Sequence, residues 1–251
     1  YGGKLNMLKH IIPLIPEHEI YVEPFFGGGA VFFAKEPASS EIINDTNNMV
    51  VNFYEVLKMY PDELRRKINA TLFSRATYKV ADTIYRMPHL FGKTQQAWAF
   101  YVATNMGFAA KIGSWGYDKY GKRTKSFVNK RMNFDDRFTK RLVTVQIENN
   151  DASVVIESRD ADDAFHYCDP PYINTDQGHY EGYTQENYIQ LLETLSRVKG
   201  KFLLSSYPSD ILDEYITQQG WYSIRFEKPL SARKAEEGAK RGNKVEVLTA
   251  N

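Results

Sequence analysis

Hydrophobic and polar residues alternate along this chain in blocks that predict short strands separated by helices. Apolar runs predict strands at residues 19–23, 41–45, 144–147, 165–168 and 201–206. Apolar positions at helical spacing predict helices at residues 30–35, 47–58, 61–73, 185–198 and 209–219, with Gly220 ending the last. Residues 221–226 and 244–249 predict a C-terminal hairpin. Because strands and helices alternate, we expect an α/β fold with a largely parallel sheet.

The stretch from about residue 73 to residue 138 interrupts this alternation. It is rich in Tyr, Trp, Gly and Lys and lacks the short apolar strands of the remaining chain. The pattern therefore predicts a main domain formed by residues 1–60 and 142–251, with an inserted second domain at residues 61–141.

Composition narrows the class of protein. The chain has 251 residues, of which 43% are hydrophobic, and no run of about 18 apolar residues that would predict a membrane span. Its single cysteine, Cys168, excludes a disulfide framework and any zinc site built from several cysteines. The five histidines show no metal-ligand spacing, so we expect no metal. Cys168 lies on an apolar strand and is interpreted as a core residue.

The net charge of +1 hides an uneven distribution of charges. Residues 111–141 sum to +7, residues 148–186 to −9 and residues 225–244 to +4. Solvated surface charge explains most such runs. The alternative is a pair of phosphate-facing patches on either side of a separate site.

A glycine turn follows the first predicted strand. Residues 23–30 read Glu-Pro-Phe-Phe-Gly-Gly-Gly-Ala, and Asp45 ends the next strand. Such a turn is the usual nucleotide-binding position of a doubly wound sheet, and the acid can accept hydrogen bonds from a ribose diol. Phe32 stands where the dinucleotide fingerprint has its third glycine, and no Gly-Lys-Ser/Thr follows. The pattern favours a nucleoside such as S-adenosylmethionine, although a tight turn with a strand-end acid remains the structural alternative.

The tetrapeptide Asp169-Pro170-Pro171-Tyr172 follows the strand at residues 165–168. Two prolines stiffen the loop, so that the carboxylate of Asp169 and the carbonyl of Pro170 form a pair of acceptors. An aromatic amino group such as adenine N6 offers two N–H donors to this pair, and accepting both makes the nitrogen more nucleophilic. Tyr172 offers a ring on which an extruded base can stack. The structural alternative is a strand-end turn stiffened by prolines.

In the order of these motifs, the chain resembles the Dam-like (D12 class, alpha-group) DNA adenine-N6 methyltransferases over nearly its whole length. The resemblance is carried by residues 1–4, 21–30, 44–47, 150–152, 169–172, 202–207 and 244–251. It implies a Rossmann-like methyltransferase sheet whose inserted, mainly helical target-recognition domain contains a β-hairpin. Residues 101–108 match the family's recognition segment poorly, so the target sequence cannot be read from them.

The resemblance also implies roles for individual residues. The expected catalytic residues are Asp169, Pro170 and Tyr172. The expected S-adenosylmethionine-binding residues are Tyr1, Lys4, Glu23, Phe25, Gly27, Gly28, Gly29, Asp45, Asp151 and Asp169. Residues 115–125 are interpreted as a hairpin that presents basic residues to DNA, and residues 233–241 as a second basic loop; the expected DNA-binding residues are Lys122, Arg123, Lys125, Arg233 and Lys234.

These features together predict a site-specific enzyme that methylates N6 of a flipped adenine in double-stranded DNA. Other amino groups stay open as targets, namely RNA adenine, cytosine N4 and protein glutamine, as does a catalytically silent DNA-binding module. We expect a monomer in the cytoplasm, of bacterial or phage origin, bound to the nucleoid through DNA and without membrane contact. A restriction endonuclease partner is compatible with the motifs.

Overall fold

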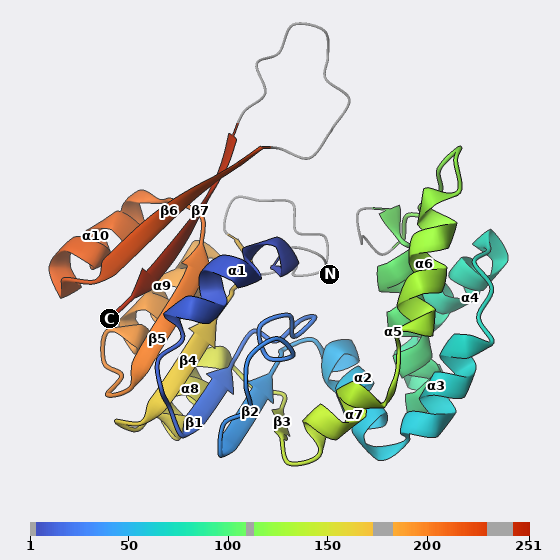
Figure 1. The fold of residues 1–251 in the computed structure, drawn as a ribbon, viewed down its shortest axis with the longest axis horizontal. Coiled ribbons are helices and arrows are strands. Elements are labelled where there is room, and N and C mark those ends of the chain that lie inside the picture. Colours follow the sequence, from blue (N-terminus) through green and yellow to red (C-terminus); the bar gives the residue numbers. More distant parts are fainter. Residues whose placement is uncertain (1–3, 109–112, 173–182, 230–242) are drawn as a thin grey trace, which may run out of the picture.

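A computed structural model describes residues 4–108, 113–172, 183–229 and 243–251. Its centre is a seven-stranded sheet with the order β3-β2-β1-β4-β5-β7-β6 (Figure 1). The strands are β1 Ile20–Glu23, β2 Ser40–Asn44, β3 Gln146–Glu148, β4 Ala164–Cys168, β5 Lys201–Ser206, β6 Tyr222–Pro229 and β7 Asn243–Ala250. Strands β1 to β5 are parallel, whereas β7 runs antiparallel to both β5 and β6. The α/β fold with a largely parallel sheet and the C-terminal hairpin are confirmed.

The strand order reverses between β1 and β4. From β1 the chain steps outward to β2 and β3, and then returns to place β4 on the other side of β1 and β5 beyond it. In open α/β sheets, ligands bind outside the carboxyl ends of the strands at this reversal. The glycine turn follows β1 and the Asp-Pro-Pro-Tyr loop follows β4, so both motifs lie at that point.

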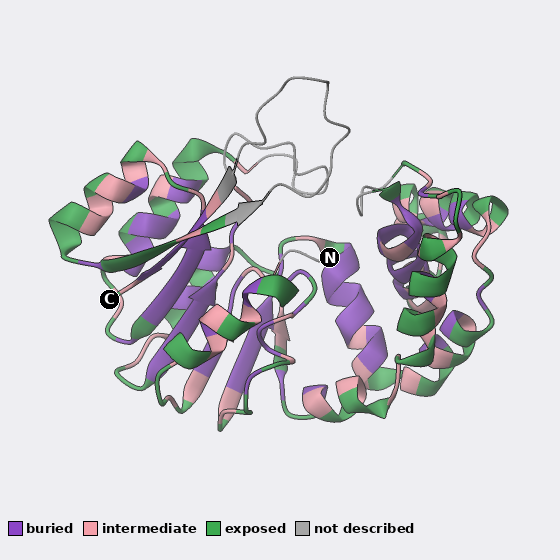
Figure 2. Ribbon diagram, turned by 45° about the horizontal axis from the view of Figure 1, so that its top comes forward, coloured by how far each residue is buried: buried purple, intermediate pink, exposed green. Residues whose placement is uncertain are grey.

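Side chains alternate between the two faces of the sheet along each strand, and both faces carry buried residues. Phe165 and Tyr167 of β4 belong to one core cluster together with Met7 and Ile11 of the N-terminal helical turns. Cys168 belongs to a second cluster on the opposite face, which is formed mainly by α8 Ala152–Arg159, α9 Gln185–Leu195 and α10 Asp210–Gln219. The central strands β1, β2, β4 and β5 are therefore buried along most of their length, whereas the edge strands β3 and β6 are mostly exposed or half-buried (Figure 2). The N-terminal turns are η1 Leu5–Met7, α1 Leu8–Ile11 and η2 Ile12–Leu14.

Residues 48–142 form a group of helices beside β2 and β3 (Figure 1). They are α2 Asn48–Met59, α3 Pro61–Asn69, α4 Arg75–Arg86, η3 Pro88–Leu90, α5 Lys93–Met106, α6 Lys122–Met132 and α7 Asp136–Leu142. Side-chain caps start several of them, with Asn47 accepting from the Met49 N–H and Ser74 from the Thr77 N–H. Residues 61–141, the predicted insertion, contain helices α3–α6, η3 and most of α7; α3 begins at Pro61, directly after α2.

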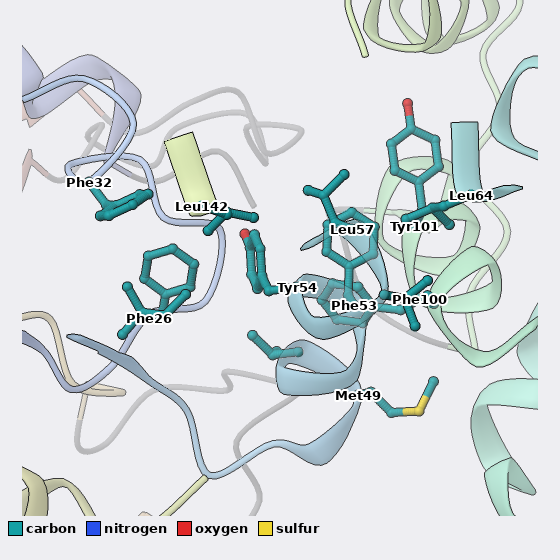
Figure 3. Close-up of a cluster of buried hydrophobic side chains, with 14 of the residues drawn as sticks. Phe26, Phe32, Met49, Phe53, Tyr54, Leu57, Leu64, Phe100, Tyr101 and Leu142 are labelled. Atoms are coloured by element: carbon teal, nitrogen blue, oxygen red, sulfur yellow. The ribbon is translucent and has the colours of Figure 1, made fainter. Parts of the chain in front are cut away.

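Aromatic side chains connect the glycine turn to this helical group. The ring of Phe26, in the turn, packs edge-on against Tyr54 of α2, with 4.6 Å between centroids. Phe53 of the same helix packs against Phe100 of α5 at 5.5 Å (Figure 3). One continuous core cluster therefore extends from the sheet through α2 into the predicted insertion.

Two predicted elements are wrong. Residues 30–35 form hydrogen-bonded turns and no helix; they follow Gly29, whose φ of +62° lies outside the right-handed helical region. The predicted ribbon at residues 115–125 also differs, since Lys122, Arg123 and Lys125 lie in the first turns of α6. Asp118 starts that helix by accepting the backbone N–H groups of Tyr120, Lys122 and Arg123.

Antiparallel pairing does occur in the insertion, but earlier in the chain. Gly107 pairs with Trp115, and the Phe108 N–H donates to the carbonyl of Ser114 at 2.6 Å. The Gly116 N–H donates to the carbonyl of Met106 at 2.9 Å. Antiparallel pairing therefore joins residues 106–108 to residues 114–116, and the basic residues of the predicted hairpin lie on the neighbouring helix α6.

Candidate active site

The glycine turn after β1 is held by Asp45, the acid that directly follows β2. The Gly27 N–H donates to Oδ2 of Asp45 at 2.8 Å, and the Asn47 N–H donates to Oδ1 at 2.9 Å. Gly27 and Gly29 have φ of +48° and +62°, which favour glycine. Gly28 is exposed between them. Asp45 therefore fixes the turn and leaves its remaining lone pairs for a ligand.

Asn44, the last residue of β2, joins two loops at the same sheet edge. Its Nδ2 donates to the carbonyls of Pro24 at 2.9 Å and Asn150 at 3.0 Å, and its Oδ1 accepts from the Asn150 N–H at 2.9 Å. It is 1% exposed. These bonds place the loop that contains Asp151 beside the glycine turn.

An aromatic and acidic group lies next to that loop. The rings of Phe25 and Tyr183 meet edge-on, with 6.1 Å between centroids. Burial, with Asp151 among the nearby groups, raises the pKa of Tyr183. Oδ1 of Asp151 accepts the Ser153 N–H at 2.9 Å and so begins α8. Half-buried rings and a carboxylate are suited to an adenine ring, which has apolar faces and an amino donor.

Burial disfavours the charged form of two acids at this edge of the sheet, Glu23 and Asp45. Burial raises the pKa of Glu23 to about 8, and the negative charge of Asp169 adds to the shift, against a hydrogen bond from Tyr21 that lowers it. Burial also raises the pKa of Asp45 to about 6, while the backbone N–H groups of Asn47 and Gly27 oppose the shift. Both acids would be favoured in their charged form by a bound cation.

Lys4 contacts side chains from two strands, β5 and β7, and from the loop that follows β4, and joins them into one cluster. Its Nζ lies 3.1 Å from Oδ1 of Asp169 and donates to Ser205 Oγ at 2.7 Å. It also donates to the Tyr172 hydroxyl and to Oε1 of Glu246. Glu246 accepts further bonds from Ser205 Oγ at 3.0 Å and the Tyr172 hydroxyl at 3.3 Å.

The Asp-Pro-Pro-Tyr loop is packed into this cluster. Pro170 is buried, and the Asp169 side chain is 24% exposed. The Tyr172 ring lies against the ring of Tyr207, with 4.0 Å between centroids and 41° between planes. Burial raises the pKa of Asp169, whereas Lys4 opposes the shift. The loop thus holds one acid at the surface of the site and one tyrosine inside it.

The structure separates the expected DNA-binding residues. Lys122 and Lys125 are exposed on α6, near the exposed rings of Tyr117 and Tyr120. Arg123 points back into the insertion, where its guanidinium donates to the carbonyl of Gly107 at 2.6 Å. Three expected site residues lie outside the described residues: Tyr1, Arg233 and Lys234.

Three side chains of the cluster escaped sequence reasoning, namely Ser205, Tyr207 and Glu246. Glu246 carried a usable signal, because a single acid inside the apolar run at residues 245–250 needs a partner when that strand is buried. Ser205 and Tyr207 carried none, since their contacts join strands that are far apart in sequence.

In the described part of the chain, no group of three or more His, Cys, Asp or Glu side chains is arranged to hold a metal ion. No helix among these residues combines the length and the apolar character needed to cross a bilayer.

Comparison with known proteins identifies the family. A model of the D12 class N6 adenine-specific DNA methyltransferases matches residues 1–226. The chain is 25% identical over 272 residues to the Type II methyltransferase M1.LlaDCHI of Lactococcus lactis subsp. cremoris, covering 100% of this chain and 93% of that protein. It is 26% identical over 250 residues to a DNA adenine methylase of Escherichia coli K12, covering 92% and 87%. A DNA N-6-adenine-methyltransferase of Escherichia phage P1 is 28% identical over 270 residues, covering 98% of this chain and 34% of that protein. The chain therefore belongs to the D12 class N6 adenine-specific DNA methyltransferases.

Proposed function

We propose that this enzyme transfers the methyl group of S-adenosylmethionine to N6 of an adenine extruded from duplex DNA. The proposal rests mainly on the glycine turn and the Asp-Pro-Pro-Tyr loop lying side by side at the strand-order reversal. The glycine turn and the Asp-Pro-Pro-Tyr loop follow adjacent strands, β1 and β4, on either side of the strand-order reversal. A donor bound at the first motif would therefore face an acceptor held at the second.

The residues around the glycine turn fit S-adenosylmethionine. Phe25 and Asp151 match its adenine ring, and the remaining lone pairs of Asp45 match its ribose diol. The exposed Gly28 lets the ligand approach the backbone closely. Glu23, buried and acidic, suits its positive charge. When bound, S-adenosylmethionine supplies an electrophilic methyl group on sulfur.

Asp169 and Pro170 orient the target amine. The carboxylate of Asp169 and the carbonyl of Pro170 accept the two N6 hydrogens, which keeps the nitrogen lone pair out of the ring and directs it at the methyl group. Positioning of this kind supplies a large share of catalytic rates. Tyr172 provides a stacking face; since Tyr207 covers part of its ring, the base stacks on the opposite face or displaces Tyr207.

The insertion is the proposed DNA-contacting part. Its exposed residues Lys122 and Lys125 can neutralise phosphates, and Tyr117 and Tyr120 can contact bases or sugars. Extrusion of the base costs a few kcal/mol, which stacking and hydrogen bonds in the pocket offset. We further propose a monomeric enzyme acting on chromosomal or phage DNA in the cytoplasm, with a restriction endonuclease of the same specificity as a candidate partner.

The test removes the proposed acceptor of the amine hydrogens. Asp169→Ala should lower transfer of labelled methyl from S-adenosylmethionine to unmethylated genomic DNA by about 100-fold or more, because the acceptor is lost. Binding of S-adenosylmethionine, measured by calorimetry, should remain measurable.

The matched control is Asp162→Ala, which changes an exposed aspartate in the loop before the same strand. It should leave transfer unchanged. Full activity in Asp169→Ala would refute the catalytic assignment.

A further inference from the structure

The Lys4 ammonium is shared between two carboxylates that come from different parts of the sheet. Asp169 follows β4, and Glu246 lies on β7, which pairs between β5 and β6. The side chain of Lys4 is 10% exposed and that of Glu246 is 8% exposed. Of the two acids, only Asp169 belongs to the motif that is proposed to bind the adenine amine.

An ammonium group has three N–H donors, and here four oxygens compete for them. Besides the two carboxylates, they are the hydroxyls of Ser205 and Tyr172. Ser205 also donates to Glu246, which fixes that carboxylate. The position of the ammonium between the acids therefore depends on the charge of both.

We infer that Glu246 is a positioning residue, which holds Lys4 away from full pairing with Asp169 and so keeps an Asp169 oxygen available for the N6 hydrogen of adenine. This inference rests on the proposed role of Asp169. Glu246 acts through Lys4 and does not itself contact the base. Tyr172, bonded to both Lys4 and Glu246, is placed by the same pair.

The charges around Asp169 predict opposite effects of the two neighbours. Lys4 reaches it from the N-terminal segment, Glu246 from β7 and Glu23 from β1, while Tyr172, Tyr167 and Cys168 lie on its own segment. Burial raises the pKa of Asp169, Lys4 lowers it and Glu246 raises it. Loss of Lys4 should therefore raise the pKa of Asp169, and loss of the Glu246 charge should lower it.

The first test is the pH dependence of kcat with labelled S-adenosylmethionine and unmethylated genomic DNA. Glu246→Gln should lower kcat at its optimum by about tenfold or more, with KM for S-adenosylmethionine changed less than about twofold, since the amine is misplaced and the cofactor is not. The acid limb of the pH profile of kcat should move to lower pH in Glu246→Gln and to higher pH in Lys4→Gln. Lys4→Arg, which keeps the charge, should leave the limb in place.

A merely structural role predicts a different pattern. If these substitutions only loosened the site, water would enter and both variants would move the acid limb to lower pH. Equal directions, or no shift, would overturn the inference. Glu193→Gln, at an exposed position of α9, is the charge-matched control and should leave kcat and the limb unchanged.

A second measurement does not depend on activity. In protein labelled with ¹³C at aspartate carboxyls, the Asp169 signal is identified by its loss in Asp169→Asn. Its titration should shift in opposite directions in Lys4→Gln and Glu246→Gln, and equal directions would overturn the inference. If the wild-type protein methylated no DNA, the proposed function would fail while this titration still decided the charge arrangement.

Discussion

At the residue scale, the site combines acids whose charged forms are disfavoured in the unliganded protein. Burial raises the pKa of Glu23 to about 8 and that of Asp45 to about 6, and it also raises the pKa of Asp169. A carboxyl whose folded pKa exceeds its unfolded value stabilises the fold fully only below the unfolded pKa, and that contribution is lost as pH rises through the folded pKa. The stabilising contribution of these acids to the unliganded protein therefore decreases as pH rises from about 4 to about 8 and stays lost above that range.

Binding of a cationic ligand should favour the ionised form of these acids and so offset their destabilising effect. S-adenosylmethionine carries a sulfonium charge that S-adenosylhomocysteine lacks, so its binding should favour ionised Glu23. We expect its affinity to rise between pH 6 and pH 8, by up to about tenfold per pH unit for each proton released. The affinity of S-adenosylhomocysteine should rise less.

Calorimetry with both ligands across this pH range measures the difference. Glu23→Gln should reduce it, because the titrating carboxyl is gone. The same pH dependence for the two ligands would show that no buried acid senses the sulfonium charge.

At the element scale, the glycine turn is rigid because side chains and backbone both constrain it. A Cβ on Gly29 would lie 2.5 Å from Cζ of Phe26. Phe26 is fixed in turn by Tyr54 and by the bond from its N–H to the Asn44 carbonyl at 2.8 Å. The turn therefore cannot relax around an added methyl group.

Two glycine substitutions separate this crowding from backbone strain. Gly29 and Gly220 have φ of +62° and +67°, but a Cβ on Gly220 would meet nothing within 4 Å. Gly220→Ala should cost about 1 kcal/mol in free energy of unfolding, from conformation alone. Gly29→Ala should cost about 1–3 kcal/mol more, from overpacking. Urea denaturation measures both, and equal costs would contradict a rigid turn.

At the scale of the whole molecule, helices α3–α7 and the sheet share one core through α2. The described basic residues of the segment that sums to +7 lie on or beside α6 and α7, and some of them, such as Arg123 and Arg141, make internal contacts. The net charge of +1 therefore does not describe the local charge of this segment.

The proposed DNA-contacting role of α6 has a salt-dependent signature. The double variant Lys122→Ala, Lys125→Ala should weaken duplex binding and reduce the slope of log K against log salt by about 2, if each lysine contacts one phosphate. Lys199→Ala, Lys201→Ala is the matched control, because these exposed lysines lie near the amino end of β5, opposite the site. Fluorescence anisotropy from 50 to 200 mM salt measures the slopes, and equal slopes would remove α6 from the interface.

Local pattern was sufficient for most of the sheet and for both motif positions. Strands such as β4 are short apolar runs with turn residues after them, and parallel strands bring their carboxyl ends to one edge. The pattern did not predict the conformation of residues 30–35, because the left-handed backbone of Gly29 before them is a property of the folded turn. It also misplaced Arg123, because the Asp118 cap and the Gly107 carbonyl are recognisable only once the chain is folded.

The contacts of Glu246 could not be predicted from the sequence either, because they too form only in the folded protein. It contacts Lys4 across 242 positions of sequence, and only the strand order of the folded sheet brings the two residues together. Its presence in an apolar strand indicated a buried partner, but not which one.

The chemical identity of the methylated product tests the proposed function most directly. Unmethylated genomic DNA treated with the enzyme and S-adenosylmethionine, then digested to nucleosides and analysed by mass spectrometry, should contain N6-methyladenine that is absent with Asp169→Asn. N4-methylcytosine in place of N6-methyladenine, or no methylated nucleoside at all, would contradict the account.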